Sequence, residues 1–300
     1  MFKRIINAIK YFSQAIFIYL LYVFLRLLPL SWAAGICAFA LRTFGCLTFF
    51  NKVAKANLDL VFPEKSDGER NQILHGMWDN LGRTMAEYCH LDALGRNRDN
   101  ITIKNYEILE SLKSNDKGTF FVLGHFANWE IGNIITRNYG ITINPVYRAP
   151  NNFFVTPLYN IRQKGLLGEL IPKGRQGAKR ILSLLKEGKN IGILADQKMN
   201  TGVSIDLLGH PAMTLDSVAI FALMRKSPIL MIQIKRTTGS KFEVTLHKSL
   251  EVIDTGDRDN DVRHILQQMN DIYSAWIREA PEQWLWIHDR WGLKKRGLIK

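Results

Sequence analysis

The sequence predicts an α/β domain, in which helices flank a largely parallel central sheet, preceded by an N-terminal membrane-anchor helix. From residue 119 onward, short apolar runs alternate with longer segments whose apolar residues recur every three or four positions. Strands and helices that alternate in this way form parallel sheets covered by helices. An uncharged stretch over residues 11–25 predicts the anchor. We therefore assign residues 1–46 to the anchor and residues 47–300 to the α/β domain.

The anchor has polar positions on one side. A membrane-spanning helix needs about 20 apolar residues, and residues 5–25 reach that length only by including a lysine. Four polar residues recur at helical spacing, which places them on one face: Lys3, Asn7, Lys10 and Gln14. A single anchor is the first interpretation, and a pair of interfacial helices kinked at Pro29 is the second. A cleaved signal peptide is disfavoured, because Arg26 and Pro29 interrupt the apolar region.

The 300-residue chain carries a formal net charge of +13, which favours anionic partners such as lipid headgroups or an acidic carrier protein. Its basic residues are spread along the chain and no nucleic-acid-binding motif is present, so we expect no nucleic-acid partner. The three cysteines lack metal-ligand spacing, so neither a metal nor a disulfide framework is expected.

The remaining segments are assigned by their periodicity. We expect helices over residues 66–91, 174–186, 214–226 and 258–279. We expect strands over residues 119–123, 141–147, 190–195, 228–235 and 241–247. The last strand alternates apolar and polar residues, as a half-exposed edge strand does.

His125 follows the buried strand 119–123, beyond Gly124, and active sites in parallel sheets lie at such carboxyl ends. Asn128 is a candidate helix cap, which places Glu130 in the first turn. On one continuous helix the two side chains would not share a face, but a loop followed by a helix start lets them converge. An imidazole can then take a proton from a hydroxyl while a carboxylate orients it. The plain alternative is a packed histidine and a glutamate that favours the helix dipole.

Residues 124–132, Gly-His-Phe-Ala-Asn-Trp-Glu-Ile-Gly, resemble the His-x4-Asp/Glu motif of glycerolipid and lipid A acyltransferases. Further blocks, in the same order, resemble the bacterial lipid A late acyltransferases, the lauroyl and myristoyl transferases. These blocks are residues 57–63, 80–87, 146–148, 195–197, 209–214 and 284–291. The resemblance therefore covers nearly the whole chain.

The resemblance implies a glycerolipid acyltransferase-like fold and a specific reaction in lipopolysaccharide biosynthesis. A fatty acyl chain, of lauroyl type, would pass from an acyl carrier protein thioester to a hydroxyl of a lipid A precursor of the Kdo-lipid IVA type. His125 would be the general base and Glu130 its orienting group. No cofactor beyond the thioester co-substrate is implied. The enzyme would act at the bacterial inner membrane, with its active site on the cytoplasmic face.

Other residues gain candidate roles from their positions. Arg148 could bind an acceptor phosphate bidentately, or pair with a nearby carboxylate. Asp196 and Gln197 end a buried strand and should face the same rim as His125, either in a substrate-binding role or as a strand-end turn. Arg290 could serve a lipid headgroup or stack on a neighbouring indole.

A local basic cluster could dock the acidic carrier protein by electrostatic steering. Its members are Lys173, Arg175, Lys179 and Arg180.

Two alternatives stay open on the sequence. The chain could acylate a lysophospholipid or a phosphatidylinositol mannoside, or it could be a non-catalytic protein that binds the membrane surface. Labelled acceptor lipids would distinguish the first, and activity that survives loss of His125 and Glu130 would indicate the second.

Overall fold

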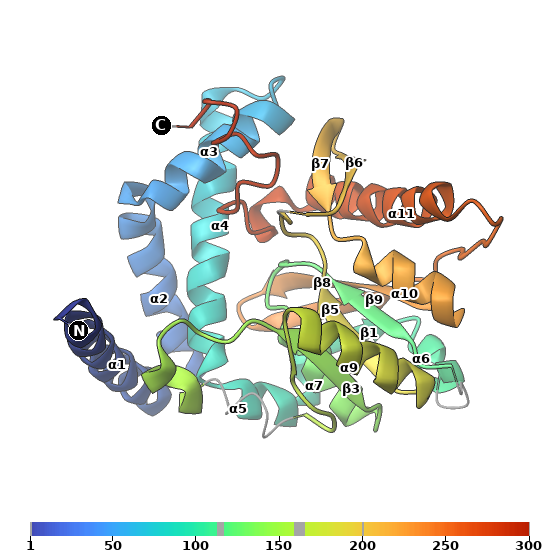
Figure 1. Cartoon of the computed structure of the whole chain (residues 1–300). Helices are drawn as coiled ribbons and strands as arrows, with labels where there is room; N and C mark the ends of the chain where they lie inside the picture. Colours follow the sequence, from blue (N-terminus) through green and yellow to red (C-terminus); the bar gives the residue numbers. More distant parts are fainter. Residues whose placement is uncertain (1, 113–116, 159–165, 200, 300) are drawn as a thin grey trace.

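The computed structural model describes residues 2–112, 117–158, 166–199 and 201–299. Within these residues, four N-terminal helices stand beside a sheet that is covered by the remaining helices (Figure 1). The four helices are α1 (Phe2–Leu27), α2 (Leu30–Phe44), α3 (Phe49–Val61) and α4 (Asp67–Tyr88).

The sheet of the described chain has seven strands in the order β1-β9-β8-β2-β5-β3-β4. Their bounds are β1 (Ile101–Lys104), β2 (Phe120–Leu123), β3 (Ile143–Tyr147), β4 (Ile171–Pro172), β5 (Asn190–Leu194), β8 (Ile229–Thr238) and β9 (Lys241–Leu246). All neighbours are parallel except β8 and β9, which form an antiparallel pair. A separate hairpin joins β6 (Val203–Leu207) to β7 (His210–Thr214). The predicted α/β class and its mostly parallel sheet are confirmed.

Strand β2 is apolar at every position because both of its faces are buried. Phe120 and Val122 pack into one core and Phe121 and Leu123 into another, on the opposite face of the sheet. The first core contains α9 (Arg175–Lys186), α10 (Ser217–Arg225) and α11 (Arg258–Glu279). The second contains α5 (Leu91–Arg96), α6 (Glu107–Leu112) and α7 (Ile131–Asn138). Because both faces are covered, all four residues of β2 are buried.

The five predicted strands are present, but the edge position assigned to residues 241–247 is wrong. Strand β9 lies between β8 and β1, with Phe242 paired to Ile101. Strand β1 has four residues, with alternate exposure, and a run this short carries little periodic signal. The alternation in β9 itself is present in the structure, since Phe242, Val244 and Leu246 are buried and the residues between them are not.

Helix α4 begins with the capping box of Ser66 and Glu69, within the segment 66–91 that was predicted to be helical. Gly82 of α4 lies against α2, where an added Cβ would come within 2.4 Å of the Cys37 carbonyl oxygen. The missing side chain therefore lets the two helices pack closely along their length (Figure 1). Residues 30–44, which we assigned to the anchor, thus pack directly on α4.

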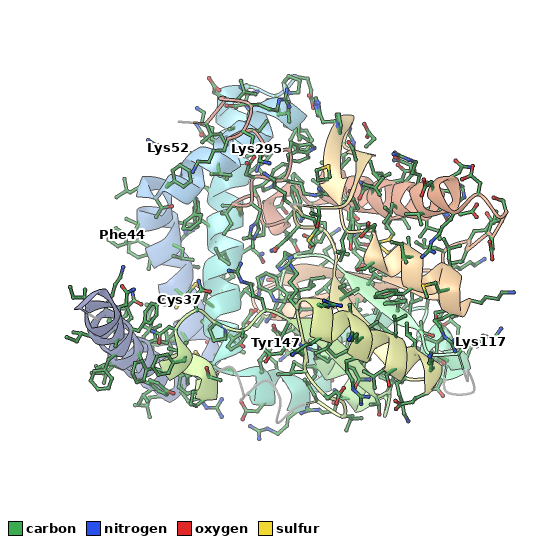
Figure 2. The ribbon with its side chains drawn as sticks, in the orientation of Figure 1. Cys37, Phe44, Lys52, Lys117, Tyr147 and Lys295 are labelled. Atoms are coloured by element: carbon green, nitrogen blue, oxygen red, sulfur yellow. The ribbon has the colours of Figure 1, made fainter. Side chains whose placement is uncertain are left out.

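The outer sides of α1 and α2 and the first turn of α3 are largely apolar. Phe44 projects from α2 on the side away from α4 and is 61% exposed (Figure 2). Other exposed members of this surface are Phe12, Phe17, Leu20, Trp32, Phe39, Phe49 and Phe50. Among the described residues, 6–27 and 30–47 form helices long and apolar enough to cross a membrane. An apolar surface of this extent points to contact with a membrane.

A buried ion pair joins α4 to the sheet. Arg236 of β8 contacts Glu87 of α4 through both guanidinium ends, one of them at 3.0 Å, and the Glu87 side chain has no exposed surface. Ser240 adds a hydrogen bond of 2.7 Å to the same carboxylate. Paired and hydrogen-bonded, the two charges tolerate burial; either one alone would not.

Glu87→Ala should therefore lower the free energy of unfolding by about 3–5 kcal/mol, because it leaves the Arg236 charge buried without its partner. Urea unfolding in detergent measures this loss. The matched control is Glu279→Ala, which breaks the pair with Lys235 where the side chains are 49% and 35% exposed. The control should lower the free energy of unfolding by about 0–1 kcal/mol. Equal losses of stability in both variants would contradict the assignment of the Glu87–Arg236 pair as a buried, stabilising contact.

Candidate active site

His125 and Asp196 meet at the carboxyl end of the sheet. His125 lies two residues beyond β2 and Asp196 two residues beyond β5, and these strands are parallel neighbours with Leu123 opposite Leu194. The Asp196 carboxylate accepts the His125 backbone N–H at 2.9 Å, and its other oxygen lies 2.7 Å from Nδ1 of the ring. The structure thus places Asp196 at the rim expected for it and in direct contact with the histidine.

Asp196 is buried, at 2% exposure, and also accepts the indole N–H of Trp284 at 2.9 Å. Burial raises the pKa of its carboxyl, but the charge and hydrogen bonds of His125, together with Trp284, outweigh burial and lower this pKa to about 2. Because the ordinary value is 3.8, ionised Asp196 stabilises the fold above that pH and loses this contribution as the pH falls toward 2. When the His125 ring is neutral, the ionised carboxylate holds its one proton on Nδ1, and Nε2 keeps its lone pair.

Gln197 lies between two imidazoles. Its side-chain nitrogen is 2.9 Å from Nε2 of His125 and 2.7 Å from Nε2 of His288. An amide nitrogen donates, so both Nε2 atoms act as acceptors. Burial, and next the charge of His125, lower the pKa of His288 to about 4, so this ring is neutral at pH 7. The amide therefore marks the position at which a hydroxyl would hydrogen-bond to the base.

The carboxylate that contacts the His125 ring in this structure is that of Asp196, and the orienting role of Glu130 stays a prediction. Glu130 is buried at the start of α7, where its carboxylate accepts Asn133 Nδ2 at 3.3 Å. Asn128, expected to cap the helix, instead accepts the Glu130 backbone N–H at 3.1 Å in the turn before α7. The sequence could not reveal the contact between Asp196 and His125, because only the adjacency of β2 and β5 brings the two residues together.

The loop that carries His125 is held by α4. Ala127 has a left-handed backbone (φ 46°), which costs a non-glycine residue about 1–2 kcal/mol. Its carbonyl accepts the Thr84 hydroxyl at 2.9 Å and its N–H donates to the Gln283 carbonyl at 2.9 Å. Asn128 donates to Glu87 at 3.0 Å, which links the loop to the buried ion pair. These contacts from distant segments hold the unfavourable backbone in place.

The segment 284–291 closes over the same rim. The Leu285 N–H donates to the His125 carbonyl at 3.1 Å, and Asn57 of α3 donates to the carbonyls of Trp286 and His288 at 2.8 and 2.7 Å. His288 belongs to this segment, and the sequence reasoning did not single it out. Its position inside the last resembling block was the one available signal.

Arg290 does not reach a headgroup. It is 1% exposed and donates to the Met213 carbonyl at 2.6 Å and to the Thr214 hydroxyl at 2.9 Å. Burial lowers its pKa to about 10, while the charge of Asp196 opposes that shift. Arg290 is therefore buried in this structure, away from the surface that a headgroup would reach, and its assignment to substrate binding stays a prediction.

The other predicted cations are exposed. Arg148 is the residue after β3, at the carboxyl end of the sheet where His125 and Asp196 also lie. Lys173, Arg175, Lys179 and Arg180 are all exposed, at or near the start of α9. Arg180 is paired with Glu169 and Glu187, and Lys173 is near enough to His288 to act on its pKa. The described residues contain no group of three metal-ligating side chains.

An apolar cavity of about 330 Å³ lies beside the site. Its wall includes Trp129, whose indole centroid is 4.9 Å from that of the His125 ring. Its other lining residues are Ile18, Leu21, Tyr22, Leu25, Cys37, Leu81, Thr84, Met85, Tyr88, Cys89, Val155 and Leu158. A histidine base next to a cavity lined almost entirely by apolar groups suits chemistry on a lipid hydroxyl.

Comparison with known proteins identifies the family of this chain. Residues 1–293 match the model of the family described as bacterial lipid A biosynthesis acyltransferase. The chain belongs to this family and is an acyltransferase.

Curated relatives are similar at low identity. A Haemophilus influenzae protein named lipid A biosynthesis acyltransferase is 22% identical, over 81% of this chain and 76% of its own. An Escherichia coli lipid A biosynthesis palmitoleoyltransferase is 23% identical, over 82% and 79%. An Escherichia coli lipid A biosynthesis myristoyltransferase is 22% identical, over 82% and 76%. The relatives thus differ in the acyl chain that their names specify.

Asp196→Asn should lower kcat by roughly 10²–10⁴-fold, because an amide does not stabilise the imidazolium and no longer fixes the proton on Nδ1. Glu130→Gln serves as the comparison, since it keeps the shape of a second buried carboxylate that lies near the base in sequence. Steady-state transfer rates with folded variants should show the smaller loss in Glu130→Gln. A larger loss in Glu130→Gln would mean that Glu130 orients His125 in the working complex.

Proposed function

We propose that this enzyme transfers a fatty acyl chain, of lauroyl type, from an acyl carrier protein thioester to a hydroxyl of a lipid A precursor of the Kdo-lipid IVA type. The observation that carries the proposal is the contact of His125 Nδ1 with the Asp196 carboxylate, which leaves Nε2 on the side of Gln197. The family membership supports the acceptor, and the net charge of +13 favours an acidic carrier and an anionic bilayer.

In the proposed reaction, the acceptor hydroxyl replaces the Gln197 amide at Nε2 of His125. The ring takes the hydroxyl proton as the oxygen attacks the thioester carbonyl, and Asp196 stabilises the imidazolium that forms. The new C–O bond remains and the C–S bond breaks as the tetrahedral intermediate collapses. The proton then passes from His125 to the departing thiolate, which restores the neutral base and releases the carrier thiol.

Arg148 suits an acceptor that carries phosphate. Its guanidinium is exposed at the strand ends beside the base, and guanidinium groups bind phosphate oxygens bidentately. Together with the apolar helices α1 and α2, this position favours an acceptor drawn from a membrane. We place the enzyme at the bacterial inner membrane, with the carrier reaching its active site from the cytoplasm.

The proposal is tested with purified enzyme, acyl carrier protein thioester and a lipid A precursor. His125→Ala should lower the transfer rate by at least about 10³-fold in a protein that remains folded, because the attacking hydroxyl loses its base. Mass spectrometry of lipid A from cells with and without the gene should show one acyl chain fewer without it. Wild-type rates in His125→Ala, or transfer only to a lysophospholipid, would overturn the mechanism or the acceptor respectively.

The basic cluster supplies a test of the carrier. Replacing Lys173, Arg175, Lys179 and Arg180 by glutamine should raise KM for the carrier thioester by roughly tenfold at low salt, with little effect on kcat. The control is a variant with the same loss of charge at exposed sites elsewhere: Lys226, Lys241, Lys248 and Arg258. Equal changes in both variants would assign the effect to net charge, and unchanged kinetics in the first would remove the cluster from carrier docking.

A further inference from the structure

Helix α1 forms a wall of the apolar cavity beside His125. It contributes four side chains to the lining: Ile18, Leu21, Tyr22 and Leu25. The facing wall comes from α4, through Leu81, Thr84, Met85 and Tyr88. Leu25 is 3% exposed, whereas Leu20, on another face of α1, is 66% exposed. One side of the helix therefore faces the cavity and another faces outward, where lipid would lie.

Polar contacts fix the C-terminal end of α1 to the catalytic part of the chain. Arg26 binds the Asp92 carboxylate through both Nη atoms, at 2.6 and 2.7 Å, and donates to the Cys89 carbonyl at 3.0 Å. The His90 ring nitrogen Nε2 lies 2.9 Å from the Leu25 carbonyl, one of the last carbonyls of the helix. A bidentate pair of this kind fixes geometry as well as adding energy.

A second set of contacts fixes α1 nearer its N-terminal end. Tyr19 donates to the Phe154 carbonyl at 3.2 Å, and Asn152 donates to the Tyr11 carbonyl at 2.8 Å. The rings of Phe12 and Phe154 pack edge to face, with centroids 5.5 Å apart. The polar contacts are spread along the helix, before, among and after the cavity-lining residues. A helix that served only as a tether would need none of them, because its own backbone hydrogen bonds satisfy it in lipid.

The cavity lies next to the base, with one side chain between them. Trp129 lines the cavity and its ring centroid is 4.9 Å from that of the His125 ring, so a group bound in the cavity lies one indole away from the imidazole. Its volume of about 330 Å³ is roughly twice the 150 Å³ of an apolar cavity that admits benzene. One hydrocarbon chain of roughly a dozen carbons fits such a space.

We propose that this cavity holds the hydrocarbon chain of the acyl donor, and that α1 is part of the active site, with Leu21 setting which chain lengths fit. The inference rests on the proposed acyl transfer and adds to it: the N-terminal helix selects the donor chain as well as contacting the membrane. The selection of the acyl chain length then depends on the contacts of Arg26, Tyr19 and Asn152 that hold α1 in place.

The test uses the full-length enzyme with a series of thioester donors of increasing chain length, compared in competition. Leu21→Trp fills the cavity and should lower kcat/KM for the longer donors relative to the shorter ones by about tenfold or more, while Leu21→Ala should shift the preference toward longer donors. Leu20→Trp and Leu20→Ala, one position along the same helix on its exposed face, are the matched controls and should keep the wild-type profile.

Equal profiles in the Leu21 and Leu20 variants would overturn the proposal. A raised KM for the lipid acceptor with an unchanged donor profile would overturn it as well, since the cavity would then hold an acceptor chain. If Leu21→Trp fails to fold by thermal melting, Leu21→Ala decides the outcome alone.

A second readout does not depend on acyl transfer. A photoreactive fatty acyl thioether should label peptides of α1 and α4 in the wild type and label them less in Leu21→Trp, with Leu20→Trp unchanged. Labelling of α1 and α4 without any transfer activity would contradict the proposed function and support the cavity as the acyl-chain site. Transfer activity with labelling elsewhere would contradict the cavity assignment and support the proposed function.

Discussion

The hydrogen bond between His125 Nδ1 and the Asp196 carboxylate, 2.7 Å long, is the contact on which the rest of the site depends. It fixes the ring tautomer and leaves Nε2 as an acceptor toward the rim, beside Gln197 and His288. Asp196 can remain charged while 2% exposed because three groups satisfy it: the His125 backbone N–H, the His125 ring and the Trp284 indole. Loss of any one would weaken the orientation of the base.

Buried polar contacts from separate parts of the chain hold the loop that carries His125, and so keep His125 beside Asp196. The left-handed residue Ala127 is held by Thr84 and Gln283, and Asn128 is held by Glu87, which itself pairs with Arg236. Helix α4 is therefore both a core element and the support of the catalytic loop. A fully satisfied polar network of this kind specifies one arrangement, because every partial arrangement leaves a buried group unpaired.

The N-terminal helices connect the exposed apolar surface to the candidate active site. Helix α2 packs on α4 through Gly82, and α1 lies against the catalytic part through Arg26, Tyr19 and Asn152. Their outer faces are apolar while their inner contacts are specific. The proposed transfer from a water-soluble thioester to a lipid hydroxyl requires both properties in the same elements, because the two proposed substrates approach from different solvents.

The sequence by itself determined the fold class, most of the central strands and the position of His125 at the carboxyl end of the sheet. Continuous apolar runs such as 120–123 report burial on both faces of a sheet, and the position of His125 after that run places it at the active rim. Periodicity did not find β1 or the interior position of β9, since four residues are too few to show a period.

Only the tertiary structure decided which residues contact His125 and Gln197. Asp196 is 71 residues from His125 in the chain and His288 is 91 residues from Gln197, and only strand order and the closing segment 284–291 bring them together. The same holds for Arg290, whose charged side chain suggests a surface role but which folding buries beneath the site. Local sequence records which residues can do chemistry, and the packing of distant segments selects which of them act together.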